Sequence, residues 1–343
     1  MTHERFQTIT SKHGALRIAV VGDFCLDRYL EIDPAKQEAS IETGLPVHNV
    51  VNVRAQPGGA GTILNNLAAL QVKTIWPVAF AGDDGEGYEL RRALAAQPGV
   101  RLDHFIQTSS RRTFAYCKPL LLQPGEGPRE LNRLDQKNWT PTPEALSARL
   151  IASVTALAND VDAMVLLSQV IEPQTGVLTA SVIECIAEIA RAKPQLLILA
   201  DSRHGLRGFP PVIFKMNAAE LSALAGTSVL SGVQGIAAAA QDLARRNCQP
   251  VFVTLAERGM VGASPDGQTQ HVSALPLRGP IDIVGAGDAV MANLAVALAA
   301  RATLREALEL ANAAASIVIH QLGDTGTAST AQLRHLLFGS TGQ

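Results

Sequence analysis

Aromatic residues and net charge are both scarce in this sequence. Phe, Trp and Tyr make up 4% of its 343 residues, and 29 Lys and Arg stand against 31 Asp and Glu, for a formal net charge of −2. A nucleic-acid partner calls for a basic surface along the phosphates and, for single strands, aromatic rings on which bases stack. The chain offers neither, so we expect no nucleic acid among its partners.

Long apolar runs are missing as well. The longest, AVMANLAVALAA at residues 289–300, is too short to span a bilayer, and residues 1–17 hold no apolar stretch of signal-peptide length. No CxxC pair and no HxxxH spacing occur, which argues against a structural zinc site. We therefore expect a cytoplasmic protein with no membrane contact. Its cysteines are widely spaced and predicted to be free thiols: Cys25, Cys117, Cys185 and Cys248.

Apolar strands alternate with helices through much of the chain. Strands are predicted at residues 17–23, 163–168, 196–201, 212–217 and 251–256, and helices at 176–193, 218–226 and 233–247. This alternation is typical of a parallel sheet covered on both faces. We therefore expect an α/β fold with three layers, α/β/α, in a single domain over residues 15–335. Ligands of such sheets bind at the carboxyl ends of the strands.

Two segments have a different pattern. Residues 28–56 and 112–135 are more polar and alternate polar with apolar side chains, as in LPVHNVVNVRA and TFAYCKPLLL. Alternation is typical of strands with one open face. Because both segments are inserted between the expected strands and helices, we expect them to pair into a small β flap, or lid.

The stretch DIVGAGD at residues 282–288 runs directly into a helical pattern. We expect a strand to end over residues 281–284 and a helix to begin at the glycines. Free N–H groups and the helix dipole favour an anion at such a place, and glycine lets it approach closely. Asp288 is expected in the first helical turn. It can serve as a helix cap or as a base beside the anion, and the stretch alone leaves both open.

These glycines match neither common nucleotide motif. No Lys-Ser/Thr follows them, as a Walker A loop requires, and the spacing is not GxGxxG. Our hypothesis is phosphoryl transfer. The N–H groups of Ala286, Gly287 and Asp288 would hold the charge of the transferred group, while Asp288 takes the proton of an attacking hydroxyl.

Three motifs together carry a family resemblance. DIVGAGDAVMANLAVAL resembles the C-terminal signature of the ribokinase-like (PfkB) carbohydrate kinases, usually D-T-x-G-A-G-D. QPGGAGTILNNLAALQV at 56–72 resembles the family's Gly-Gly-rich segment, and KMNAAE at 215–220 matches its N-x-x-E. The resemblance runs from about residue 15 to 330. It implies a ribokinase-like fold with a mostly parallel central sheet and a lid, and a sugar kinase that uses ATP and Mg²⁺.

The resemblance assigns the phosphate end of the site. Asp288 is the base, and the anion hole comprises Gly285, Ala286 and Gly287. Asn217 and Glu220 lie near the Mg²⁺–phosphate site, which they would contact through water, and the two metal-binding candidates are Glu220 and Asp282. Whether a monovalent cation also binds near the 282–288 turn stays open.

Further motifs resemble the family's nucleotide side. TLAERG at 254–259 is similar to its nucleotide-side loop, and ALELANAAAS at 307–316 to the helix beside the adenine. The nucleotide-binding residues implied are Asn217, Thr254, Glu257, Gly259 and Asn312. Structural alternatives remain: Asn217 and Glu220 also fit a helix N-cap with its third residue, and Asn312 fits an ordinary amphipathic helix.

The sugar side is implied by two of the motifs. AVVGDFCLDRYL at 19–30 resembles the family's first strand, whose Asp binds sugar hydroxyls. By position that residue is Asp27, and Asp23 directly follows the strand. A carboxylate can accept two hydroxyl hydrogen bonds, although a turn cap is the alternative for either residue. The Gly-Gly-rich segment adds four substrate-binding candidates: Gly58, Gly59, Thr62 and Asn66.

The combination GDxxLDRY with PGGAxxxxxNLAAL is closest to the heptose-7-phosphate kinase branch of the family. These bacterial enzymes phosphorylate the anomeric hydroxyl on the way to ADP-heptose, and ELNRLD at 130–135 matches an Arg-Leu-Asp in their flap. A sugar phosphate needs cationic partners, ideally Arg. The flap offers Arg111, Arg112, Lys118 and Arg133, of which Lys118 and Arg133 are our substrate-binding residues. Solvated surface charge is the alternative for each.

Several positions depart from the family pattern. Thr62 replaces a common Asn, Ile283 a Thr or Val, and Ala256 a glycine, while residues 201–203 read Asp-Ser-Arg instead of Asp-Pro-Lys. We also expect no nucleotidyltransferase domain within these residues. The departures leave open a ribokinase-fold binding or regulatory protein with altered catalysis.

A nucleoside kinase of the same fold is a third reading. The flap aromatics available to a nucleobase are Tyr29, Phe114 and Tyr116. Because exposed flap edges can pair, we expect a homodimer through the lid.

Overall fold

A large sheet and a smaller one make up the β structure of this chain. The computed structural model describes residues 1–123, 125, 127–226, 232–323 and 325–339. The large sheet has nine strands in the order β16-β15-β14-β13-β12-β11-β1-β6-β7. Neighbours from β14 to β7 are parallel, whereas β15 and β16 are antiparallel. The strands are β1 (Arg17–Gly22), β6 (Thr74–Gly82), β7 (Phe105–Thr108), β11 (Ala163–Ser168), β12 (Leu197–Ser202), β13 (Ile213–Asn217), β14 (Val251–Thr254), β15 (Met260–Ala263) and β16 (Thr269–Val272).

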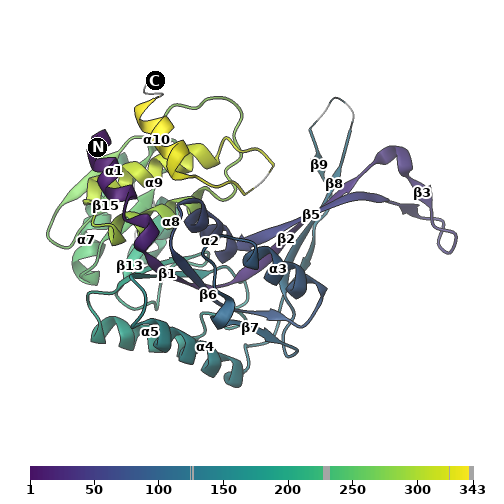
Figure 1. The fold of residues 1–343 in the computed structure, drawn as a ribbon, viewed down its shortest axis with the longest axis horizontal. Coiled ribbons are helices and arrows are strands. Elements are labelled where there is room, and N and C mark those ends of the chain that lie inside the picture. The colour runs from purple at the N-terminus through teal and green to yellow at the C-terminus, as the bar shows by residue number, and fades with distance from the viewer. Residues whose placement is uncertain (124, 126, 227–231, 324, 340–343) are drawn as a thin grey trace.

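Helices cover both faces of this sheet. Figure 1 shows α4 and α5 below it, while α2, α8 and α9 pack together on the other side. The helices are α1 (His3–Thr10), α2 (Ala60–Ala69), α3 (Gly85–Ala95), α4 (Glu144–Leu157), α5 (Ala180–Ala192), α6 (Ala218–Ala225), α7 (Gly232–Asn247), α8 (Ala286–Ala299), α9 (Leu304–Val318) and α10 (Thr330–Phe338). The apolar strands are buried on both sides, since Val20 and Val165 are fully covered. The predicted three-layer α/β/α fold is confirmed.

The smaller sheet is the predicted flap, and it projects from the body (Figure 1). Its strand order is β10-β8-β2-β5, with β9 paired to β8, and a two-stranded pair, β3–β4, extends it. β2 runs antiparallel to β5 and parallel to β8. The strands are β2 (Phe24–Ile32), β3 (Glu38–Ala39), β4 (Pro46–Val47), β5 (Val50–Gly59), β8 (Phe114–Leu121), β9 (Arg129–Glu130) and β10 (Leu134–Gln136).

One predicted strand is wrong. Residues 281–284 belong to no strand, and the chain between β16 and α8 has irregular structure apart from a turn at its end. Their apolar side chains are exposed instead of buried in a sheet: Ile281 by 43%, Ile283 by 74% and Val284 by 49%. Pro276, Gly279 and Pro280 interrupt this stretch, which cannot therefore supply a regular ladder of hydrogen bonds.

Two further boundaries differ. β14 ends at Thr254, before the predicted limit of 256, and α5 begins at Ala180, behind its cap Thr179, later than predicted. Within the described residues, no helix is both long and apolar enough to cross a membrane. All four cysteines are free, as expected.

Candidate active site

The turn before α8 has the geometry of an anion site. Gly285 is the N-cap of α8 with φ +81°, a left-handed conformation that favours glycine. Ala286 begins the helix, but its N–H donates to the carbonyl of Ile283 at 3.3 Å. The N–H groups of Gly287 and Asp288 also lie in the first turn, where the helix has no carbonyl groups to accept their hydrogen bonds. Of the three donors we expected, these two suit an anion best.

Asp288 occupies the third position of α8 and is half-buried. Burial raises the pKa of its carboxyl to about 7, with further upward pressure from Asp201 and Asp27 and a downward contribution from Lys215 and Arg203. A general base works best when its pKa is close to the working pH. Asp288 therefore has the protonation chemistry of a base at neutral pH, while its position also suits the helix dipole.

Lys215 is a site residue for which the sequence analysis proposed no role. It lies on β13, is buried, and its Nζ is 2.5 Å from Oδ2 of Asp201 on β12. A Cβ added to Gly287 would come within 3.1 Å of this Nζ, so the ammonium lies directly beneath the α8 turn. Burial lowers the pKa of Lys215, but Asp201, Asp288 and Glu220 together raise it above its ordinary value, and the side chain stays charged. A lysine within the apolar run VIFKMN was the available signal.

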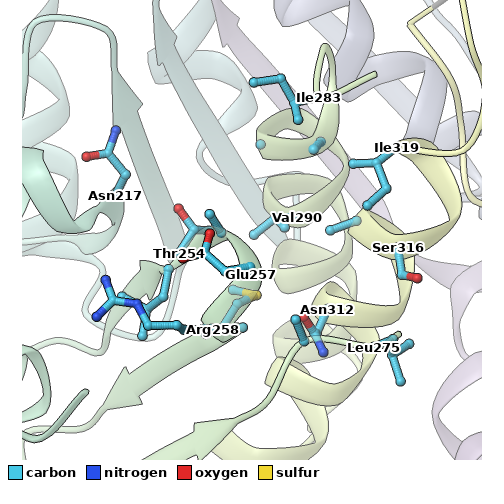
Figure 2. Close-up of a pocket in the computed structure, with 18 of the residues that line it drawn as sticks. Asn217, Thr254, Glu257, Arg258, Leu275, Ile283, Val290, Asn312, Ser316 and Ile319 are labelled. Carbon is cyan, nitrogen blue, oxygen red and sulfur yellow. The ribbon is translucent and has the colours of Figure 1, made fainter. Parts of the chain in front are cut away.

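A cavity of about 870 Å³ opens beside this turn. Figure 2 shows Thr254 and Glu257 on one side of it, Val290 of α8 behind, and Asn312 at the far end. All five predicted nucleotide-binding residues line it, together with Ala286 and Gly287. The Asn312 amide donates to the carbonyl of Ser273 at 2.8 Å. This volume lies in the range of small-molecule and cofactor sites, with the anion site at one end.

The loop after β14 shows why its family motif uses glycine. Gly259 has φ +87°, and a Cβ there would come within 2.0 Å of the Val272 carbonyl oxygen. Ala256 has φ +52°, where the family usually has glycine. An alanine can adopt this conformation at a cost of about 1 kcal/mol, so the loop keeps its shape despite the substitution.

Asn217 and Glu220 form a capping box at the start of α6. The N–H of Glu220 donates to Asn217 Oδ1 at 2.9 Å, and the N–H of Asn217 donates to Glu220 Oε2 at 2.7 Å. Burial raises the pKa of Glu220, although its hydrogen bond from Asn217 lowers it. The structural alternative is therefore present, and Asn217 nevertheless lines the cavity of about 870 Å³.

Mg²⁺ fits Glu220 better than it fits Asp282. Mg²⁺ at phosphate sites usually binds one or two carboxylates and takes its other ligands from phosphates and water. Glu220 is a half-buried carboxylate close enough to Asp201 and Lys215 to sense their charges. Asp282 accepts a hydrogen bond from the Val284 N–H at 3.0 Å, which shapes the turn. In the described part of the chain, no three His, Cys, Asp or Glu residues could hold a metal ion together.

On the sugar side, Asp27 holds the position expected of a hydroxyl-binding carboxylate. It lies on β2, 3.7 Å from Lys118 Nζ, and its charge raises the pKa of Asp288. A Cβ on Gly58 would come within 2.6 Å of its carboxylate, and one on Gly59 within 2.5 Å of the Asp23 carbonyl oxygen. These two glycines therefore let β5 approach the junction of the two sheets. Thr62 lies next to the α8 turn, 3.5 Å from a Cβ on Gly285.

Two predicted sugar ligands are engaged by the backbone instead. The Asp23 carboxylate accepts N–H groups of Gln169 at 2.7 Å, Val170 at 3.2 Å and Val177 at 2.7 Å. The amide of Asn66 is bonded to carbonyls of Thr62 and Gly326 and to the Ala328 N–H. Both side chains are buried, so their geometry supports an anchoring role over contact with a sugar.

The cationic side chains of the flap segments also differ in their contacts. Arg111 is buried and donates to carbonyls of Thr140, Pro141 and Thr175, so it is a structural residue. Lys118 and Arg54 both lie 4.7 Å from the centre of the Tyr29 ring. Arg112 takes part in the flap through its backbone, which bonds to Asn138.

A second group of cations surrounds Tyr116, which is paired in register with Asp27. Arg133 lies 5.2 Å and Lys137 6.0 Å from its ring centre, and both contact Asp135. Arg203 is near enough to lower the pKa of both Tyr116 and Asp288. Lys137 and Arg203 were not among the predicted residues. Residues paired in register point to one face of a sheet, which places this group on the Asp27 side of the flap.

Comparison with known proteins agrees with this geometry. Residues 16–331 match the family described as "pfkB family carbohydrate kinase". The chain is 32% identical over 331 residues to the "Bifunctional protein HldE" of Bradyrhizobium sp. (strain ORS 278), covering 96% of this chain and 65% of that protein. It is 31% identical over 311 residues to the HldE of Paramagnetospirillum magneticum, covering 89% and 60%. The chain thus spans less than two thirds of these relatives.

Solved structures share the fold. Ribokinase of Arabidopsis thaliana, complexed with ribose and ATP, superposes with a TM-score of 0.68 at 19% identity, covering 94% of this chain and 99% of that one. Phosphofructokinase-2 of Escherichia coli in complex with fructose-6-phosphate gives a TM-score of 0.67 at 19% identity, covering 94% and 98%. These likenesses confirm the predicted ribokinase-like architecture.

Proposed function

Because the chain belongs to the PfkB family of carbohydrate kinases, we propose that it transfers the γ-phosphoryl group of ATP to a hydroxyl of a sugar phosphate. One observation carries the proposal. Asp288, whose pKa is about 7, lies in the first turn of α8, at the anion end of the nucleotide cavity and within electrostatic reach of Asp27. Donor site, base and acceptor site therefore meet at one turn.

The transfer is a single displacement. The acceptor oxygen bonds to the γ-phosphorus while the bond from that phosphorus to the bridging oxygen of ADP breaks, and the hydroxyl proton passes to Asp288. The N–H groups of Gly287 and Asp288 stabilise the charge on the transferred group. Glu220 would help to hold Mg²⁺, which would supply positive charge to neutralise the phosphates. Because the reaction needs ATP, we propose that the protein is located in the cytoplasm.

The flap supports a phosphorylated acceptor. Arg133 and Lys137 lie over the ring of Tyr116, and Arg203 is close enough to lower the pKa of Tyr116. Arg133 and Lys137 both form ion pairs with Asp135. Arg and Lys donors suit a phosphate dianion. We propose that the acceptor is heptose 7-phosphate and that its anomeric hydroxyl is phosphorylated. The support is the resemblance of GDxxLDRY to the heptose-7-phosphate kinase branch, together with the HldE relatives.

A nucleoside acceptor is less well supported. The rings of Tyr29 and Tyr116 are each contacted by two cations, and Phe114 is buried against Phe80. A nucleobase would have to displace these partners in order to stack. The observed contacts therefore favour the sugar phosphate.

We also propose a homodimer formed through the flap. β5 is an edge strand, and it exposes Val50, Val51 and Val53 by 42–45%. Leu45, on the β3–β4 extension, is 65% exposed. Unpaired edges and exposed apolar side chains favour association with a second copy.

The proposal is tested by measuring ADP release with heptose 7-phosphate, other sugar phosphates and their unphosphorylated parent sugars. We expect turnover with a sugar phosphate, and a loss of about 10²–10⁴-fold in kcat for Asp288→Asn. Asp242→Asn, an exposed change on α7, is the matched control and should leave kcat unchanged.

Two outcomes contradict the proposal. Near-wild-type turnover by Asp288→Asn would show that another group accepts the proton. Binding of ATP and sugar phosphate without turnover by the wild type would support the binding or regulatory reading instead.

A further inference from the structure

Beneath the anion site lies an ion pair that proton transfer to Asp288 does not by itself require. Lys215 and Asp201 contact each other at 2.5 Å, with only 9% and 13% of their side chains exposed. A buried pair pays a desolvation cost that its own attraction often fails to recover. Because this pair lies under the carboxylate that we propose as the base, we infer that it is kept for function and not for stability.

The two strands hold this pair rigidly. Asp201 lies on β12 and Lys215 on β13, which are adjacent parallel strands of the large sheet. The Lys215 ammonium lies 3.1 Å from the position of a Cβ added to Gly287, the residue before Asp288. Its place is thus fixed by the sheet and not by a loop.

Four charged side chains act on Asp288. Lys215 and Arg203 are cations, while Asp201 and Asp27 are anions, so the surrounding charges balance. Arg203 is exposed, and water screens its effect. Lys215 is buried, where a charge acts more strongly over the same distance. Lys215 is therefore the dominant cation, and Asp201 opposes it.

We propose that Lys215 is a positioning residue that keeps Asp288 ionised near neutral pH, and that Asp201 limits this effect, so that the pair sets the pH at which the base becomes active. The catalytic meaning of this inference rests on the proposed function. The protonation of Asp288 can nevertheless be measured in the protein without substrate.

The test is a carbon-detected NMR titration of the Asp288 carboxyl in the full chain, with the pH profile of kcat/KM alongside. Lys215→Met should move the titration midpoint to higher pH by about one unit or more, which lowers the ionised fraction about tenfold well below the midpoint. Asp201→Asn should move it to lower pH. Lys215→Arg should restore a midpoint close to that of the wild type.

The matched control is Lys73→Met, an exposed lysine directly before the amino end of β6, which should leave the titration midpoint of Asp288 unchanged. Midpoints that stay in place, or that move in the same direction in Lys215→Met and Asp201→Asn, would overturn the inference. If Lys215→Met does not fold, Asp201→Asn still decides by its direction. If Asp288→Asn retains turnover, the proposed role of Asp288 as the base fails, while the titration result stands.

Discussion

At the scale of single residues, the site has groups that are unfavourable for folding but useful for chemistry. Asp288 is a carboxylate whose ionised form is destabilised by burial, Ala256 adopts a left-handed backbone, and Lys215 is a buried cation. These features lie around one cavity, with Ala256 in its lining and Asp288 and Lys215 at the α8 turn beside it. A protein retains them when their cost is offset by function.

Asp288→Asn should therefore stabilise the protein at high pH. Because its folded pKa, about 7, is raised above the ordinary 3.8, Asp288 contributes stability that is present below about pH 4 and lost as the pH rises through 7. The gap between those values sets an upper bound of about 4 kcal/mol, which water reduces at this half-buried position.

Denaturant unfolding at pH 5 and pH 8 measures this effect. We expect the advantage of Asp288→Asn over the wild type to grow from pH 5 to pH 8, with Asp242→Asn as the neutral control. A difference in stability that is the same at both pH values would mean that burial does not raise the pKa of Asp288.

At the scale of elements, the start of α6 has two roles that can be separated. Asn217→Ala removes the N-cap and should cost about 1 kcal/mol of stability. Asn217→Asp keeps a capping oxygen and adds a charge that suits the helix dipole. In the nucleotide cavity the same charge opposes the phosphates, so we expect the KM for ATP to rise about tenfold or more.

Ser329→Asp is the matched control, because Ser329 caps α10 with a capping box of the same kind, outside the nucleotide cavity. It should leave the KM for ATP unchanged. A normal KM in Asn217→Asp would leave Asn217 with the capping role alone.

Elements also show how far the sequence could lead. Continuous apolar runs predicted the parallel strands, and the alternating segments predicted the flap, because burial on two faces or on one leaves a direct imprint on the pattern. The apolar residues Ile281, Ile283 and Val284 led to the wrong prediction of a strand, since a run of apolar residues does not reveal whether it packs in a sheet or faces a ligand cavity.

The candidate site divides in the same way. Motif spacing led to Asp288 and the cavity-lining residues. Asp23 and Asn66 are engaged by distant backbone groups at residues 169–177 and 326–328, which no local pattern encodes. Lys215, Lys137 and Arg203 likewise become site residues only when the strands and the flap are assembled in space.

At the scale of the whole molecule, the flap has an open edge that a second copy would cover. Val53→Lys places a charge in the proposed interface, where burying it is costly. We expect the wild type to sediment as a dimer and Val53→Lys as a monomer at the same concentration. Leu322→Lys, at a position that is 56% exposed outside the flap, is the control and should remain dimeric. A monomeric wild type would contradict the proposed assembly.

The irregular segment between β16 and α8 forms one wall of the nucleotide cavity, with Leu275, Leu277 and Ile281 facing it. It is attached to the residues directly after α9 through hydrogen bonds from the Arg278 N–H to His320 and from the Asp282 N–H to Ile319. The phosphate end, in contrast, is built into α8 and β13. Selection of the nucleobase and chemistry at the phosphate thus depend on separate parts of the chain. Evolution or engineering can change the donor nucleotide by exchanging this wall, without disturbing the core or the catalytic carboxylate of Asp288.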